Sequence, residues 1–138
     1  MHRKVVMPTL ALVVGIAVGI FGDRLLLAQQ APVTRTMLQQ KDLEGIAGRE
    51  VVMYRVEAVP GFPGEMHYHS GPEFVYILEG ALLVESDGQP PVALKAGDSA
   101  HLPAMNRHIA KNASSTAPVK LLVVIVAEKG QPLTTPVK

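Results

Sequence analysis

The sequence predicts an all-β domain, a small sandwich or barrel, preceded by an N-terminal hydrophobic signal or anchor helix. Three features of the chain support this prediction. A long apolar run occupies residues 5–21 and is confined to the N-terminus. From residue 49 onward, short apolar or alternating segments follow one another between turns that contain glycine or proline. No segment after residue 30 has the apolar stripe of an amphipathic helix. Short strands between such turns are typical of β-sandwiches and barrels.

Residues 1–28 have the composition of a signal peptide or a signal-anchor. Arg3 and Lys4 precede the uncharged run of residues 5–21. A basic start before an apolar stretch is typical of secretory signals, and the basic end should stay in the cytoplasm. Ala28 is a candidate cleavage site, but the run also reaches the lower length limit for a membrane span. Cleavage and retention both stay open. The rest of the protein is expected to be exported, to the periplasm or another extracytoplasmic compartment, with membrane contact only through this segment.

The remainder of the chain divides into three predicted regions. Residues 29–48 are polar with scattered apolar groups, and they are interpreted as a linker or N-terminal arm with a short strand around residues 34–39. Residues 49–128 are predicted to form the β-barrel. Residues 129–138 are predicted to be an exposed tail or arm.

The barrel strands are predicted from alternation and from turn residues. In residues 51–59, Val52, Tyr54, Val56 and Ala58 share one face and charged residues occupy the other, which is the period of a strand. Residues 119–127 are the most apolar segment and are predicted to form the central strand. The other strands are predicted at residues 73–79, 81–85, 92–95, immediately before Pro103, and at 107–111.

Composition and charge exclude several classes of function. The chain has no cysteine, which excludes disulfides, iron–sulfur clusters and thiol catalysis. Its formal net charge is +1, and residues 29–138 contain 10 basic and 11 acidic residues. Because there is no basic stripe and no aromatic RNA-binding motif, nucleic acid is not expected as a partner. A small barrel has room for one small ligand, so a small molecule is the expected partner. Edge strands favour pairing, which makes a homodimer a candidate assembly.

Four residues form a candidate metal-binding set: His67, His69, Glu73 and His108. The first three stand in the run H-Y-H-S-G-P-E. Residues two apart on a strand point to the same face, so His67 and His69 project together, and the turn at residues 70–72 allows Glu73 to return to them. His108 must come from a separate strand. Imidazole nitrogens and a carboxylate oxygen suit one divalent transition metal, namely Fe, Mn, Zn, Ni, Co or Cu. The alternative is a pair of ordinary surface histidines beside a turn.

The wider pattern resembles the cupin family. The first cupin motif, G-x5-H-x-H-x3,4-E-x6-G, matches residues 61–80 at every fixed place. The second motif, G-x5-P-x-G-x2-H-x3-N, matches residues 97–112 except that Met105 replaces the glycine after proline. The resemblance implies a double-stranded β-helix, a jelly-roll barrel, over about residues 49–128. It also implies that His67, His69, Glu73 and His108 are the ligands of one metal.

Met105 departs from the motif in a turn. A methionine adopts positive φ less readily than glycine, so the local geometry of this turn is an open question. Met105 is interpreted as a turn or packing residue, and the alternative is that its side chain covers the mouth of the metal site.

Further residues are candidates for a role in the site. For each of them a solvated or core position is the more ordinary interpretation. They are His101, Glu65 at the rim, Tyr54 and Tyr76 as pocket hydroxyls, and Arg55 and Arg107 as groups that bind an anionic substrate.

The N-terminal segment and the resemblance together predict an exported metal-binding cupin, and they leave the reaction open. One hypothesis is a metal-dependent dioxygenase that acts on a small organic molecule. A second hypothesis is a non-catalytic cupin that binds or senses a small ligand. A third is a structural β-sandwich with a degenerate site, which would contain little metal after purification. The sequence assigns no catalytic residue.

Overall fold

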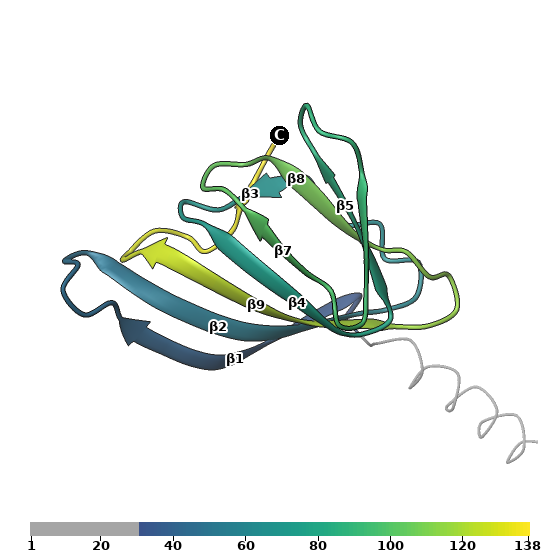
Figure 1. Cartoon of the computed structure of the whole chain (residues 1–138), viewed down its shortest axis with the longest axis horizontal. Coiled ribbons are helices and arrows are strands. Elements are labelled where there is room, and N and C mark those ends of the chain that lie inside the picture. Colours follow the sequence, from purple (N-terminus) through teal and green to yellow (C-terminus); the bar gives the residue numbers. More distant parts are fainter. Residues whose placement is uncertain (1–30) are drawn as a thin grey trace, which may run out of the picture. The chain divides into compact units, whose positions relative to one another are not determined.

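The computed structural model describes residues 31–138, which form ten β-strands in two five-stranded sheets (Figure 1). The all-β prediction is confirmed, because these residues contain no helix, and therefore none that has the length and apolar character to cross a bilayer. Residues 1–28 lie outside the described residues. The signal or anchor and the export of the protein therefore stay predictions, which N-terminal sequencing of the protein and cell fractionation would test.

The first sheet has the strand order β1-β2-β9-β4-β7, and every neighbouring pair is antiparallel. The strand at residues 119–127 was predicted to be central, and β9 does lie between β2 and β4. The bounds of these strands are β1 Val33–Asp42, β2 Arg49–Ala58, β4 Glu73–Glu79, β7 Ser99–Leu102 and β9 Val119–Glu128.

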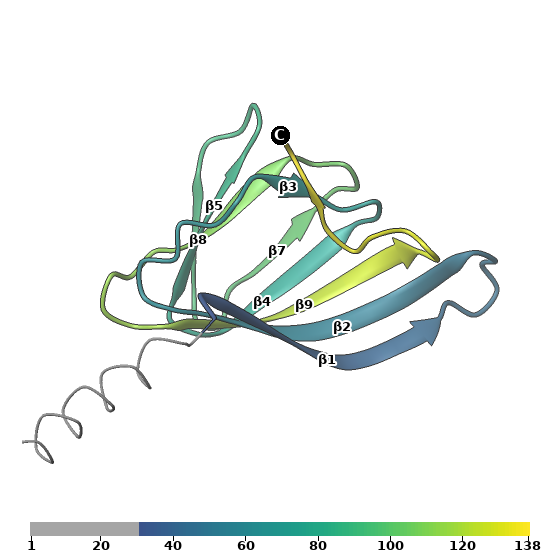
Figure 2. The same cartoon turned by 180° about the vertical axis from the view of Figure 1, so that it is seen from behind.

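The second sheet has the strand order β10-β3-β8-β5-β6 and is also antiparallel. All of its strands are shorter than the ten-residue strands β1, β2 and β9 of the first sheet. Figures 1 and 2 show from opposite sides that it stands over the inner face of the first sheet. The bounds of its strands are β3 His67–Tyr68, β5 Ala81–Ser86, β6 Val92–Lys95, β8 His108–Asn112 and β10 Thr135–Pro136.

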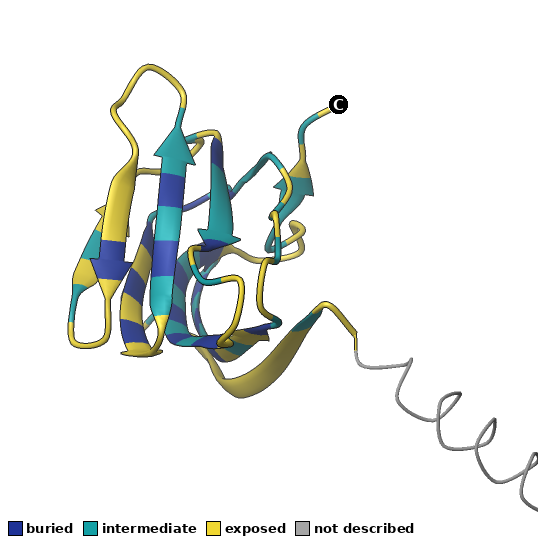
Figure 3. Cartoon of the chain, turned by 90° about the vertical axis from the view of Figure 1, so that its right-hand side faces the viewer, coloured by how far each residue is buried: buried dark blue, intermediate teal, exposed yellow. Residues whose placement is uncertain are grey.

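The core lies between the two sheets, where alternate side chains of each strand point inward. In β2 the predicted inner face is confirmed, since Val52, Tyr54 and Ala58 are buried and Val56 packs against them. In β9 every second residue is buried. This alternation appears as dark and light bands along the strands in Figure 3. Burial of one face of each sheet is what fixes the strand register.

β1 is the edge strand of the first sheet and is longer than the short strand predicted for residues 34–39. Only Val33 is partly buried, and the other residues of β1 are exposed. A bulge at Leu38 interrupts its pairing with β2. The homodimer that such an edge would favour stays a prediction.

The C-terminal tail is not a free end. Thr135 and Pro136 form β10, which pairs with Tyr68 and His67 of β3. The N–H of Val137 donates to the carbonyl of Met66 at 2.9 Å. The tail therefore lies beside the strand that begins the histidine motif, which the sequence did not indicate.

Gly71 allows the chain to pass from the histidine strand to the start of β4. A Cβ at this position would lie 1.8 Å from the carbonyl oxygen of Val126, a distance that no side chain tolerates. The N–H of Val126 also donates to the carbonyl of Pro72 at 3.1 Å. This close approach to β9 places Glu73 at the first position of β4, facing inward.

Asn112 ends the second motif and has a structural role. Its side-chain amide donates to the carbonyls of Val59 and Ala117, at 2.9 and 2.8 Å, and its carbonyl oxygen accepts from the N–H of Ser114 at 2.9 Å. Asn112 thereby ties together two loops at one end of the domain, and it is buried in doing so.

Candidate metal centre

The candidate ligands come from both sheets and meet between them. His67 belongs to β3, and His69 follows one residue after that strand. His67 lies directly opposite His108 of β8 in the strand register. Glu73 opens β4 in the facing sheet. The second sheet thus supplies three imidazoles and the first sheet supplies the carboxylate.

The three imidazoles form a tight cluster. The ligand atoms of His67, His69 and His108 all lie within 4.8 Å of one another, which is close enough for one metal ion. One carboxylate oxygen of Glu73, Oε2, lies 3.3 Å from Nε2 of His69 and 3.4 Å from Nε2 of His108. His69, Glu73 and His108 are buried, and His67 is half-buried. The structure therefore brings all four predicted ligands together.

Each histidine uses its Nδ1 atom for a backbone carbonyl. The acceptors are the carbonyls of Glu65 for His67, Leu133 for His69 and Asn106 for His108. Because a carbonyl can only accept, Nδ1 carries the hydrogen of each neutral ring, and Nε2 of the neutral ring keeps its lone pair. A backbone carbonyl on the outer nitrogen is the usual support of a metal-binding histidine.

The inward-facing atoms of the cluster fit a cation. Nε2 of His69 and Oε2 of Glu73 are buried and have no hydrogen-bond partner within residues 31–138. Both atoms are lone-pair acceptors in the tautomer that the backbone imposes, so neither can donate to the other. Buried acceptors without a donor are costly. A proton or a metal ion between them removes this cost, and three imidazoles with a carboxylate are a ligand set that transition metals favour.

The pKa values of the cluster follow from burial and from its one carboxylate. Burial lowers the pKa of His67. Burial also acts to lower the pKa of His69, but Glu73 and the Leu133 carbonyl outweigh it and raise that pKa. Burial acts to raise the pKa of Glu73, yet His108 and His69 lower it to about 2. Glu73 is therefore an anion at physiological pH and is available as a ligand.

A cavity of about 230 Å³ lies between the sheets, and the cluster forms part of its lining. Most of the remaining wall is aliphatic, from inward-facing residues such as Val75, Leu82, Val84 and Leu121. Such a wall excludes water and leaves the cluster as the main polar part of the interior.

The exposed lining residues mark the mouth of the cavity. They are Pro32 before β1, Arg35 in β1, Glu65 before β3, and Pro136 in β10. β1 and β10 are edge strands of the two sheets. The mouth of the cavity therefore lies between the arm and the tail.

Two of the further candidates line the cavity. Tyr54 is buried in the wall, and burial followed by the charge of Glu73 raises the pKa of its hydroxyl above the usual range. Glu65 is exposed and lines the mouth, so its predicted place at the rim agrees with the structure.

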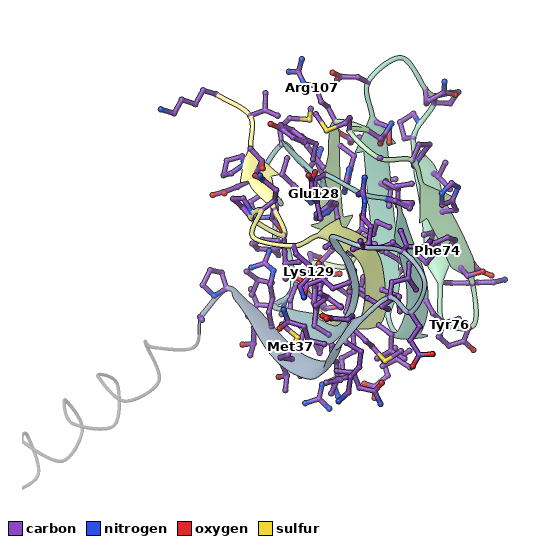
Figure 4. All side chains as sticks on the ribbon, turned by 90° about the vertical axis from the view of Figure 1, so that its left-hand side faces the viewer. Met37, Phe74, Tyr76, Arg107, Glu128 and Lys129 are labelled. Atoms are coloured by element: carbon purple, nitrogen blue, oxygen red, sulfur yellow. The ribbon has the colours of Figure 1, made fainter. Side chains whose placement is uncertain are left out.

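The other candidates do not line the cavity. Tyr76 is 47% exposed and stands with Phe74 on the outer side of the first sheet (Figure 4). Its interpretation as a pocket or core residue is wrong. His101 is exposed and its ring stacks near Phe74, with ring centroids 4.9 Å apart. Arg55 is exposed, and Arg107 pairs with Asp87 at 3.3 Å.

Sequence reasoning missed two contributors to the site. Arg35 lines the cavity from β1, and it lies in the short strand that was predicted around residues 34–39, but no role in the site was predicted for it. The alternation of Val33, Arg35 and Met37 in a strand was the signal that could have found it. The carbonyl of Leu133 supports His69 from 64 residues away. Every residue has a backbone carbonyl, so nothing in the sequence could indicate that this one contacts His69.

The cupin resemblance is confirmed by comparison with known families. The chain belongs to the cupin family, because the family model of the cupin domain matches residues 54–125, which is more than half of its length. No curated protein sequence matches the chain.

Solved structures share the fold at low sequence identity. A cupin superfamily protein from Desulfitobacterium hafniense DCB-2 has a TM-score of 0.59 and 20% identity, over 73% of this chain and 83% of that one. A DMSP lyase from Ruegeria pomeroyi DSS-3 has a TM-score of 0.59 and 23% identity, over 73% of this chain and 50% of that one. An oxalate oxidase has a TM-score of 0.60 and 20% identity, over 80% of this chain and 57% of that one. These matches establish the double-stranded β-helix.

Proposed function

We propose that His67, His69, Glu73 and His108 bind one divalent transition metal, and that the protein is a metal-dependent enzyme acting on a small organic molecule. The observation that carries this proposal is the contact of each histidine Nδ1 with a backbone carbonyl. Each ring is held by a backbone carbonyl at Nδ1, so that Nε2 is free to bind a cation beside a buried carboxylate. Dioxygenase chemistry is the first reaction to test.

A metal bound there would supply Lewis-acid or redox chemistry to a molecule in the adjoining cavity. The residues around it have separate roles. The aliphatic walls position the apolar part of the molecule and exclude water. Glu73 is ionised, so it can accept a proton if it is not engaged as a ligand. Tyr54 stays neutral because burial raises the pKa of its hydroxyl, so it can donate a hydrogen bond.

Metal content tests the ligand assignment. We expect the full-length protein, purified without a metal-binding tag, to contain about one transition metal ion per chain. His69→Ala should lose most of that metal, since even the loss of a residue that only supports a ligand costs about 10- to 100-fold in affinity. The measurement is elemental analysis of both proteins after dialysis.

The matched control is His101→Ala, which removes an exposed histidine outside the cavity. It should keep the wild-type metal content. Equal metal in wild type and His69→Ala, or little metal in either, would reject the proposal. Circular dichroism should show that both variants keep the β fold.

Turnover separates the enzyme from a cupin that only binds a ligand. The metal-loaded protein is incubated with candidate phenols and keto acids, and oxygen uptake and products are followed. Oxygen consumption that depends on the metal and on His69 supports the dioxygenase. Tight binding of a compound that is recovered unchanged would support the non-catalytic alternative instead.

A further inference from the structure

Arg35 is the one lysine or arginine among the residues that line the cavity. It lies in β1 opposite Val56, which also lines the cavity. Its neighbours Thr34 and Thr36 do not line it, as expected for alternation along a strand. The Arg35 side chain is therefore on the inner face of the first sheet, at the mouth.

Arg35 lies near Tyr54 on the inner face of the first sheet. Tyr54 lies opposite Met37 in the strand register, so Arg35 is its diagonal neighbour on the same face, at roughly 7–8 Å between backbones. Both residues line the same cavity as the four candidate ligands. Arg35 thus stands between solvent and the candidate ligands.

We propose that the cavity binds a small monocarboxylate with an apolar body, and that Arg35 pairs with its carboxylate at the mouth. This inference rests on the proposed function and names the class of molecule that the metal would act on. The planar guanidinium presents two parallel donors that match a carboxylate. A buried tyrosine hydroxyl normally finds a hydrogen-bond partner, and a carboxylate oxygen beside Arg35 would provide one for Tyr54.

Size and charge narrow the class of ligand. The cavity volume of about 230 Å³ is below the roughly 300–1,000 Å³ of pockets that hold drug-sized ligands, so the ligand is small. The aliphatic walls require an apolar body. Arg35 is the one lysine or arginine among the described lining residues, so the mouth offers a cationic side chain to a single carboxylate.

The test compares acids with their neutral amides. The full-length protein is loaded with Zn²⁺, which has no redox chemistry, and is titrated with benzoate, hexanoate and 3-methylbutanoate and with the primary amide of each. Binding is measured by calorimetry. We expect the wild type to prefer at least one acid over its amide. Arg35→Gln should weaken binding of that acid by about tenfold or more, since a hydrogen bond to a charged group is lost, and should leave binding of its amide unchanged.

Arg55→Gln is the matched control. It makes the same change of charge on the same sheet, but Arg55 is exposed and does not line the cavity. It should bind the acid as the wild type does. Arg35→Lys keeps the charge but loses the fork of two donors, so its affinity for the acid should lie between those of wild type and Arg35→Gln.

Two further measurements keep the inference separate from the proposed function. Elemental analysis should find wild-type zinc in Arg35→Gln, because Arg35 is not a ligand. The titrations are repeated after chelation, and the effect of Arg35→Gln should persist in the zinc-free protein. Absence of metal binding would reject the proposed function alone. An equal affinity for acids and amides across the panel, or an equal loss in Arg35→Gln and Arg55→Gln, would overturn the carboxylate assignment.

Discussion

Met105 has a backbone conformation that is unfavourable for a residue with a side chain. It is the non-glycine residue with positive φ among residues 31–138, at 62°, and it is 58% exposed. Its N–H donates to the carbonyl of His69 at 2.9 Å, so the turn is fixed by the site rather than by the preference of methionine. Met105 does not line the cavity. Its interpretation as a turn residue therefore agrees with the structure, and its alternative role as a cover for the metal is not supported.

Replacing Met105 by the glycine of the family motif should stabilise the protein. The left-handed conformation costs a side-chain-bearing residue roughly 1–2 kcal/mol, and glycine loses roughly 0.5–1 kcal/mol more in chain entropy on folding. We expect Met105→Gly to raise the free energy of unfolding by about 0.5–1 kcal/mol, measured by urea denaturation. Metal content should stay at the wild-type level.

Ala104→Gly is the control for this substitution. Ala104 is exposed and next to Met105, but its φ is not positive. Glycine there brings the entropy cost without relief of strain, so the variant should be less stable than the wild type. If Met105→Gly were destabilised as much as Ala104→Gly, the backbone at residue 105 would not be strained.

Among the strands, the two shortest, β3 and β10, hold His67 and His69 of the site in place. β3 and β10 have two residues each. β3 carries His67, and β10 holds the tail beside it, which brings the carbonyl of Leu133 onto Nδ1 of His69. The long strands β2 and β9 supply the buried wall on which these short elements rest. The tail therefore completes the support of the site although it adds little to the core.

Removal of residues 133–138 should weaken metal binding while the barrel persists. The deletion takes away the carbonyl that orients His69 and fixes its tautomer, and loss of such a support costs about 10- to 100-fold in metal affinity. The affinity is measured by competition with a chelator, and circular dichroism should show an unchanged β signal.

A side-chain substitution separates the carbonyl from the packing of the tail. Leu133 is partly buried against the core, and Leu133→Ala removes that contact but keeps the backbone carbonyl. It should lower stability and leave metal affinity close to the wild-type value. A deletion variant that bound metal as tightly as the wild type would show that the tail is dispensable for His69.

For the molecule as a whole, local sequence signals were enough to predict most strands of the barrel and the four residues of the candidate metal site. Alternation in β2 and the apolar run of β9 reflect burial of one or both faces, which acts on every residue of a strand. The histidine motif was readable because metal-binding residue types are rare and their spacing is tied to a turn, where Gly71 is required by contact with Val126.

Features that depend on contacts between distant segments could not be predicted in this way. β1 was predicted only as a short strand around residues 34–39, because its residues are mostly exposed, and its pairing with β2 extends the strand over Val33–Asp42. The position of Arg35 in the cavity lining depends on that pairing. The tail was interpreted as an exposed tail or arm, and its pairing was not predicted because its partners, Met66 and β3, lie more than 60 residues earlier in the chain.

The acid sensitivity of the metal-free protein should follow from Glu73. In the folded chain without metal, the pKa of Glu73 is lowered from its ordinary value of 4.5 to about 2 by His108 and His69, against the effect of burial. Between these two pH values the unfolded chain binds a proton that the folded chain does not. The stabilisation from Glu73 is therefore present above about pH 4.5 and is lost as the pH falls toward 2.

We expect the chelator-treated wild type to lose on the order of a few kcal/mol of unfolding free energy across this pH window, because each unit of pKa shift corresponds to roughly 1.4 kcal/mol. Glu73→Gln has no carboxyl group at this position, so its stability should change less over the same range. Glu57→Gln, which removes an exposed carboxylate from β2, should behave as the wild type does. The measurement is urea unfolding of all three metal-free proteins at several pH values from 2 to 5. Parallel curves for wild type and Glu73→Gln would mean that the carboxylate and the imidazoles are not coupled in the folded protein, and the four residues would then not form one site.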